Sequence, residues 1–148
     1  MSTISFPSCI DYHRTMAATL TAGDALNREA SILALAKDFW FLTRDLRALV
    51  AEINNLTQAP SKELETFVSN LEGLHLRLNG LLDHAHKKGL AKRRIISFSV
   101  ASIRAHNEDL KDAIERLHLA NDCEIRDAAL EATAEYERGE TVSLESVL

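Results

Sequence analysis

Two Glu-x-x-His motifs, Glu72–His75 and Glu115–His118, carry the residue types of this chain that are best suited to chemistry. Residues three apart share one face of a helix, and two such motifs on facing helices of a bundle bind paired metal ions in some proteins. The spacing here argues against a shared metal. Counted from Gly89, His75 is 14 residues along one predicted helix and His118 is 29 residues along the next, so antiparallel helices would hold the imidazoles about 20 Å apart in height. We therefore expect no metal and no other cofactor.

The other reactive side chains form no recognisable catalytic set. His13 and His106 stand alone, and His84 and His86 are two residues apart, a spacing that places them on different faces of a helix. The chain has no GxSxG, no GxGxxG and no phosphate-cradling GxxxxGK motif. The sequence therefore favours a protein that is not an enzyme.

Cysteine use and hydropathy favour a cytoplasmic protein. Cys9 and Cys123 belong to no CxxC pair and are expected to be reduced thiols. The N-terminus lacks the basic segment and apolar run of a secretory signal. No stretch approaches the roughly 18 uninterrupted apolar residues that a membrane span needs.

Apolar side chains recur in steps of three and four along three long segments, which is the pattern of helices that pack in a bundle. The stripes are Ile32, Leu35, Phe39, Leu42, Leu46, Leu49, Ile53 and Leu56; Leu64, Phe67, Leu71, Leu74, Leu78, Leu81 and Ala85; and Ile96, Val100, Ile103, Asn107, Leu110, Ile114 and Leu117. They predict long helices from about Ala25 to Leu56, from Ser61 to Gly89, and from Leu90 onward. Leu33 and Trp40 lie beside the first stripe and are expected to widen its packed face.

Shorter helices are predicted at the two ends of the chain. One runs from Ser8 to about Thr21, with Gly23 in the left-handed position after it and Asp24 capping the next helix. The other is the alanine-rich stretch Cys123–Arg138. Since short connections make consecutive helices antiparallel neighbours, the fold class is all-α, an up-and-down antiparallel helical bundle of three long helices plus these two. Residues 1–138 are expected to form the bundle domain and residues 139–148 a C-terminal tail.

Asn107 falls on a core position of the third stripe. It is either a partly exposed or water-bonded amide, or a buried polar residue that specifies register or partner. In the second case it would act because an unpaired buried amide penalises every other alignment.

Five cations lie at the predicted turn between the second and third long helices: Lys87, Lys88, Lys92, Arg93 and Arg94. No acid occurs between Asp83 and Glu108. The cluster is short and contains no interleaved aromatic residue, so nucleic-acid binding is not favoured and a solvated turn is expected. Two alternatives stay open, which are contact with anionic lipid headgroups and contact with an acidic partner, including the acidic end of this chain.

The end of the chain carries most of the negative charge. Up to Asn107 there are 13 basic and 10 acidic residues, whereas from Glu108 onward there are 4 basic and 12 acidic residues. A segment of this charge complements a basic surface and speeds encounter with it. Its apolar residues lie in a stretch too short to bury them well, so they are the expected contacts to a partner: Tyr136, Val142, Leu144, Val147 and Leu148.

Residues 126–148 resemble the C-terminal tails of small prokaryotic antitoxins. The stretch Arg126–Ala132 is rich in alanine and acid, and Gly139–Leu148 reads Gly-Glu-Thr-Val-Ser-Leu-Glu-Ser-Val-Leu. The rest of the chain does not resemble the usual DNA-binding halves of such antitoxins. The resemblance implies a protein whose acidic, lightly packed tail binds a protein partner.

The leucine-rich antiparallel helices, with Asn107–Leu110 leading to Leu117–Ala120, are also similar to the HeLo-like and MLKL-type four-helix bundles of cell-death proteins. That likeness implies oligomerisation or contact with a membrane surface through the basic turn.

Taken together, these features of the sequence favour a non-enzymatic helical interaction protein with a protein partner. The alternative function is a HeLo-like bundle that oligomerises or docks on a membrane, and regular heptads are also compatible with a homo-oligomer.

Overall fold

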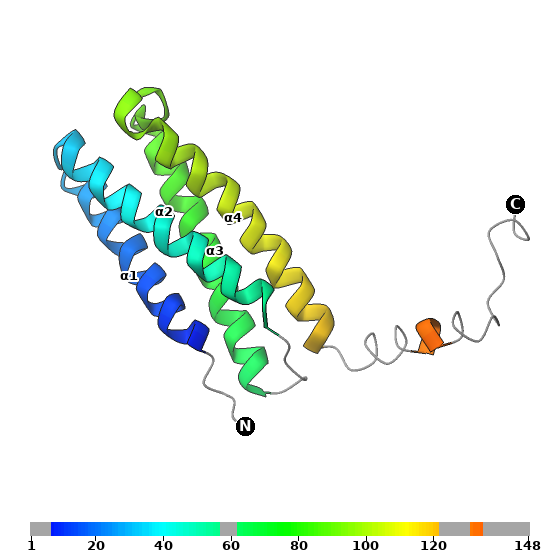
Figure 1. The fold of residues 1–148 in the computed structure, drawn as a ribbon. Helices are drawn as coiled ribbons and strands as arrows, with labels where there is room; N and C mark the ends of the chain where they lie inside the picture. Colours follow the sequence, from blue (N-terminus) through cyan, green and yellow to red (C-terminus); the bar gives the residue numbers. More distant parts are fainter. Residues whose placement is uncertain (1–6, 57–61, 122–130, 135–148) are drawn as a thin grey trace, which may run out of the picture.

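Four long α-helices lie side by side in the computed structural model, which describes residues 7–56, 62–121 and 131–134 (Figure 1). They are α1 (Pro7–Asn27), α2 (Ile32–Asn54), α3 (Lys62–Lys87) and α4 (Arg94–Asn121), with a one-turn 3-10 helix, η1 (Leu90–Lys92), between α3 and α4. The described residues contain no strand. The prediction of an all-α helical bundle is confirmed.

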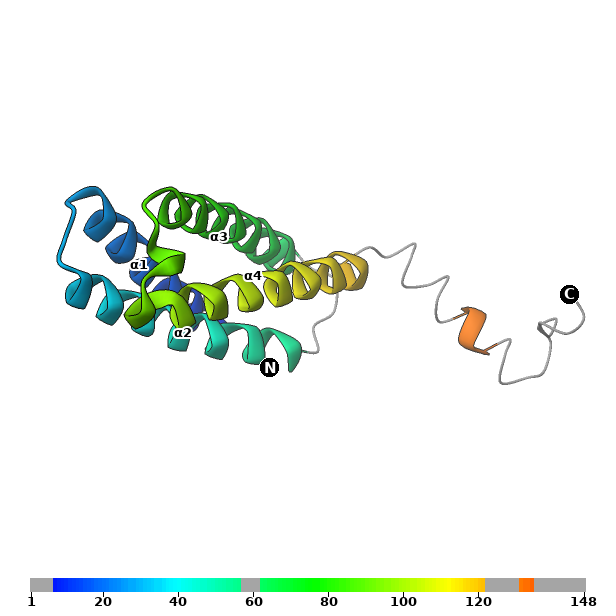
Figure 2. The ribbon, with the colours of Figure 1, turned by 90° about the horizontal axis from the view of Figure 1, so that it is seen from above.

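Each helix packs against two of the other three. The contacting pairs are α1 with α2, α2 with α4, α4 with α3, and α3 with α1, whereas α2 and α3 do not touch (Figure 2). The chain alternates up and down as predicted, with antiparallel contact within the α1–α2 and α3–α4 pairs. However, α2 and α3 lie diagonally across the bundle, so that α2 and α4 become parallel neighbours. Residues of the two helices face each other in the same order: Trp40 and Phe98 line the same groove, and Arg116 is hydrogen-bonded to Asn54.

Helix α1 is longer than the sequence suggested, and the predicted end near Thr21 is wrong. The helix continues through Gly23 to Asn27, because its last turns bury Ala22, Ala25 and Leu26 in the core. That burial outweighs the cost of one glycine inside a helix, about 1 kcal/mol. The fourth member of the bundle is thus a full-length α1.

The turn between α1 and α2 uses different residues from those predicted. The left-handed residue is Glu29, with φ of 55°, and not Gly23. The cap of α2 is Ser31, whose hydroxyl accepts a hydrogen bond from the Ala34 N–H at 3.2 Å, so the proposed capping role of Asp24 is also wrong. The predicted Ser61 cap of α3 lies outside the described residues.

The three predicted apolar stripes form the core. All their members are buried except Ile32 and Leu56, which are half-buried at the ends of α2. Gly89 ends the α3 region with φ of +75°, as expected, and α4 begins four residues after Leu90 because η1 intervenes. An ion pair of 3.4 Å between Lys88 Nζ and Glu29 Oε1 joins the α1–α2 and α3–α4 turns at the same end of the bundle.

Tyr12 of α1 provides a test of the α1–α3 contact. Its ring meets that of Phe67 edge to face, with centroids 6.5 Å apart, and burial raises the pKa of the Tyr12 phenol above 10.0, which the nearby Arg77 only partly offsets. The neutral phenol therefore stabilises the fold below pH 10, and this contribution is lost as pH rises through the folded-state pKa. In the Tyr136→Phe variant, where Tyr12 is the only tyrosine, tyrosinate absorbance should rise with a midpoint above 10.0. A midpoint at or below 10.0 would contradict this packing, and urea-unfolded protein is the control.

Candidate functional site

The predicted partner contacts at the end of the chain lie outside the described residues. This holds for Tyr136, Val142, Leu144, Val147 and Leu148, and for most of the predicted last helix. Within that helix, residues 131–134 are described and form one helical turn (Figure 1).

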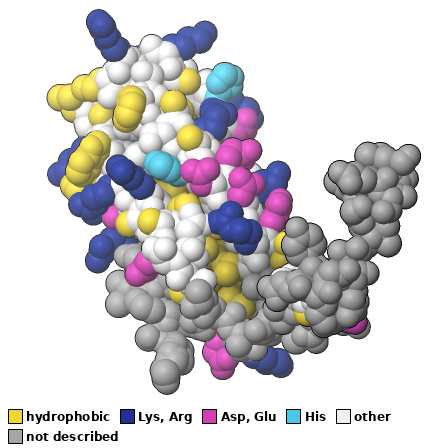
Figure 3. Space-filling view, turned by 45° about the vertical axis from the view of Figure 1, so that its right-hand side comes forward, with side chains coloured by type: hydrophobic (Ala, Val, Ile, Leu, Met, Phe, Trp, Pro, Cys, Tyr) yellow, Lys and Arg dark blue, Asp and Glu magenta, His cyan; other side chains and the backbone are white. Residues whose placement is uncertain are grey.

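The basic cluster occupies the turn end of the bundle, as predicted. Lys87 pairs with Asp83 at 3.2 Å, one helical turn away, and Lys88 pairs with Glu29. No described residue forms an ion pair with Lys92, Arg93 or Arg94. In Figure 3, lysine and arginine side chains flank hydrophobic ones at this end, whereas acidic side chains gather further along the bundle. Three cations are thus available to an anionic partner.

The two Glu-x-x-His motifs do not converge on one point. Glu72 Oε2 on α3 meets His118 Nε2 on α4 at 2.9 Å, whereas the His75 ring lies against Asn107, 11 residues before His118. The two histidines therefore contact different levels of α4, about 16 Å apart along its axis. In the described part of the chain, no three His, Cys, Asp or Glu side chains are grouped closely enough to hold a metal ion.

Asn107 is buried, and its amide is hydrogen-bonded by protein groups of α3. His75 Nδ1 donates to Asn107 Oδ1 at 2.9 Å, and Asn107 Nδ2 donates to Asn79 Oδ1 at 2.8 Å and to the His75 carbonyl at 3.5 Å. Asn79 Nδ2 lies 3.4 Å from His75 Nε2, so one tautomer of His75, protonated at Nδ1, satisfies every contact. The amide is therefore buried and not partly exposed, and its role in setting register stays a prediction, developed below.

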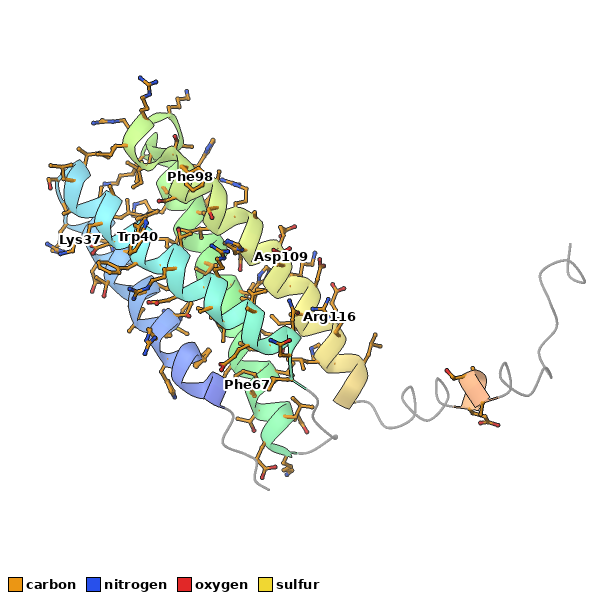
Figure 4. All side chains as sticks on the ribbon, in the orientation of Figure 1. Lys37, Trp40, Phe67, Phe98, Asp109 and Arg116 are labelled. Carbon is orange, nitrogen blue, oxygen red and sulfur yellow. The ribbon has the colours of Figure 1, made fainter. Side chains whose placement is uncertain are left out.

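An open groove runs between the parallel helices α2 and α4. It has a volume of about 470 Å³, and small side chains from both helices, among them Ala48, Ala51, Ser99 and Ser102, leave this space. Trp40 and Phe98 line one end of the groove, where Figure 4 shows them on neighbouring helices. We call this feature the α2–α4 groove.

Both aromatic residues of the groove are exposed, Trp40 by 56% and Phe98 by 81%. The expectation that Leu33 and Trp40 widen the packed face of α2 is therefore wrong, since Leu33 is 67% exposed as well. Each follows a stripe residue directly, and one residue is a rotation of about 100° around a helix. Because α1 and α4 already cover the stripe from Leu35 to Ile53, this rotation places Leu33 and Trp40 in solvent.

The exposed residues of α2 form a second heptad-like stripe that sequence reasoning missed. Its members step by four and three, and all are exposed: Leu33, Lys37, Trp40, Arg44, Arg47 and Ala51. Its signal in the sequence was the placement of Leu33 and Trp40 at the spacing of a second face of the helix. This stripe combines large apolar groups with three cations.

Arg44 lies against the aromatic end of the groove. Its guanidinium carbon lies 5.8 Å from the Trp40 ring centroid and 4.9 Å from that of Phe41. Its Nε and Nη2 donate to Asp45 Oδ1 at 3.2 and 3.1 Å, which balances part of the positive charge. Arg47 also lines the groove, and no described residue forms an ion pair with it. The groove is therefore suited to an apolar segment that carries negative charge.

No protein family, no curated protein and no solved structure matches this chain. The described helices include none with the length and apolar character needed to cross a lipid bilayer.

Proposed function

We propose that this chain is a non-enzymatic helical interaction protein, which binds a protein partner through its acidic C-terminal segment (residues 135–148). One observation carries the proposal. Helix α1 completes the four-helix cross-section, and the four helices bury one another's apolar stripes. The bundle core therefore does not require the C-terminal apolar residues, which leaves them free to serve recognition.

The chemistry of the C-terminal segment supports a partner with a basic and apolar surface. It contains four glutamates and one arginine, together with the apolar residues Tyr136, Val142, Leu144, Val147 and Leu148. Opposite charge steers the encounter of two proteins, and apolar anchors that become buried slow their separation. This reading agrees with what the resemblance to antitoxin tails implies.

A capture experiment with full-length variants tests this function. The tail variant combines Val142→Ser, Leu144→Ser and Val147→Ser, and the matched control is Leu76→Ser, which changes an exposed leucine of α3. Immobilised wild type and control are expected to retain the same proteins from a lysate of the source cells, and the tail variant is expected to lose them, as shown by mass spectrometry. Identical capture by all three chains would overturn the proposed role of the tail.

A second candidate function is docking on an anionic membrane surface through the basic cluster. It is favoured by Lys92, Arg93 and Arg94, which precede the exposed residues Ile95 and Phe98. Cations beside exposed apolar side chains are typical of proteins that bind lipid headgroups.

Sedimentation with phosphatidylserine vesicles tests this candidate. It compares the wild type, the tail variant, the Leu76→Ser control and a fourth chain in which Lys92, Arg93 and Arg94 become Glu. Sedimentation lost only in the fourth chain would assign function to the basic cluster, and no sedimentation would exclude this second candidate.

A further inference from the structure

We propose that the α2–α4 groove is the docking site of the chain's own C-terminal segment. The inference rests on the proposed function, because the same residues 135–148 would bind both the groove and the partner. Docking in the groove would also affect partner binding, because the partner would have to compete with the bundle for residues 135–148. Four observations support it, concerning composition, shape, reach and tethering.

The composition of the groove matches that of the segment. The groove presents the aromatic rings of Trp40 and Phe98 next to Arg44 and Arg47. The segment offers five apolar side chains among four glutamates. Apolar contacts with the rings would supply binding energy, and opposite charges at the edge would favour this ligand over a basic or neutral one.

The shape and charge of the groove disfavour two other occupants. A second copy of the same groove would bring Arg44 and Arg47 against identical cations. A lipid bilayer presents a flat face, whereas this groove is a concave space of about 470 Å³ between two helices. Side chains projecting from a peptide segment can enter such a space, as in helix-in-groove recognition.

The chain between α4 and the segment is long enough to reach the groove. The groove extends along α4 from Phe98 to His106, which lie about 35 and 22 Å from the end of the helix at Asn121. Residues 122–130 span at most about 30 Å when extended, and the helical turn 131–134 adds about 6 Å. Residue 135 can therefore reach the His106 end of the groove, and the 14 residues of the segment are long enough to continue from there to Phe98.

Tethering favours the segment of the same chain over that of a second copy. A short linker holds its ligand at an effective concentration of about 1 mM, well above the micromolar concentration of a typical protein solution. Even a weak contact with the groove is then largely formed within one molecule.

Trp40 is the only tryptophan of the chain, so its fluorescence reports on the groove directly. In the bundle alone it is 56% exposed, and an occupied groove would cover most of that area. In the purified full chain we expect acrylamide to quench Trp40 about three-fold less than in the tail variant defined above, with emission at shorter wavelength. Leu76→Ser should behave like the wild type.

Groove-side variants keep the fluorophore and test the other half of the contact. Phe98→Ala and Arg47→Glu are expected to raise quenching to the level of the tail variant, and Lys111→Glu, an exposed cation on the far half of α4, should leave it unchanged. Helicity measured by circular dichroism confirms that each variant is folded. Equal quenching in wild type and tail variant would overturn the proposal, even if the tail variant fails to capture a partner.

Dilution identifies the source of the segment. Protection that persists on dilution by about 100-fold supports docking within one chain. Protection that disappears on dilution assigns the groove to the segment of a second copy and overturns the intramolecular form. Because these measurements need no partner, they fail or succeed independently of the capture experiment.

Discussion

Replacing Phe39 with alanine is expected to lower the free energy of unfolding by about 3–5 kcal/mol, measured by urea denaturation. Phe39 is completely buried in α2 and is the largest of the fully buried side chains among the described residues. Its truncation removes apolar contacts and leaves a cavity that the surrounding leucines fill only in part. Small domains have a free energy of unfolding of about 5–15 kcal/mol in total, so this single change should remove a large fraction of it.

The neighbouring residue supplies the control for this prediction. Trp40→Ala, made in the tail variant so that a docked C-terminal segment does not contribute, removes a larger side chain, but one that is 56% exposed, so we expect a loss of less than about 1 kcal/mol. Phe39→Leu, which keeps most of the volume, should fall between the two and remains measurable if Phe39→Ala does not fold. Similar losses at positions 39 and 40 would mean that α2 is rotated from the orientation described above.

Asn107→Ala is expected to cost about 2–3 kcal/mol, the second largest effect. The substitution removes the hydrogen bonds to His75 and Asn79 and opens a cavity at the α3–α4 interface. In a double-mutant cycle, Asn107→Ala and Asn79→Ala should be coupled by about 0.5–1.5 kcal/mol, because they remove the same bond. Asn70→Ala, at an exposed position of α3, is the control and should change stability by less than about 0.5 kcal/mol.

Asn107→Leu separates stability from register. A leucine fills the site with apolar volume, so it should recover part of the loss seen with alanine while leaving His75 and Asn79 to solvent. If Asn107 specifies register, the leucine variant should show more than one set of amide resonances or a mixed oligomeric state. A single native-like spectrum would show that Asn107 is a tolerated core amide without a specifying role.

The buried faces of α2, α3 and α4 were predictable because a helix that packs on two neighbours repeats its apolar residues every three or four positions. The same rule placed Asn107 in the core. It did not predict the length of α1, whose last turns bury the small residues Ala22 and Ala25 beside a glycine. Small side chains give a weak periodic signal, and the local turn preference of Gly23 was overruled by tertiary packing.

The candidate site was only partly visible in the sequence. The five cations at the turn were found because they lie close together in the sequence, between Lys87 and Arg94. The ion pair of Lys88 was not predictable, because its partner Glu29 is 59 residues away. The groove was missed because it forms only where α2 and α4 are neighbours. No local sequence pattern indicates which helices of a bundle pack side by side and which lie diagonally across it. Once that arrangement is known, the second stripe of α2 becomes the lining of a surface.

The diagonal placement of α2 and α3 also shapes how the chain assembles. The protein consists of two helical hairpins, α1–α2 and α3–α4, and each covers only one flank of its own apolar stripes. The remaining flanks are covered when α2 docks on α4 and α1 docks on α3. These contacts join residues about 55–65 positions apart, so we expect them to form after the hairpins, since a long loop must close first. Because each hairpin by itself would leave part of its apolar stripes uncovered, we expect residues 7–121 to unfold cooperatively.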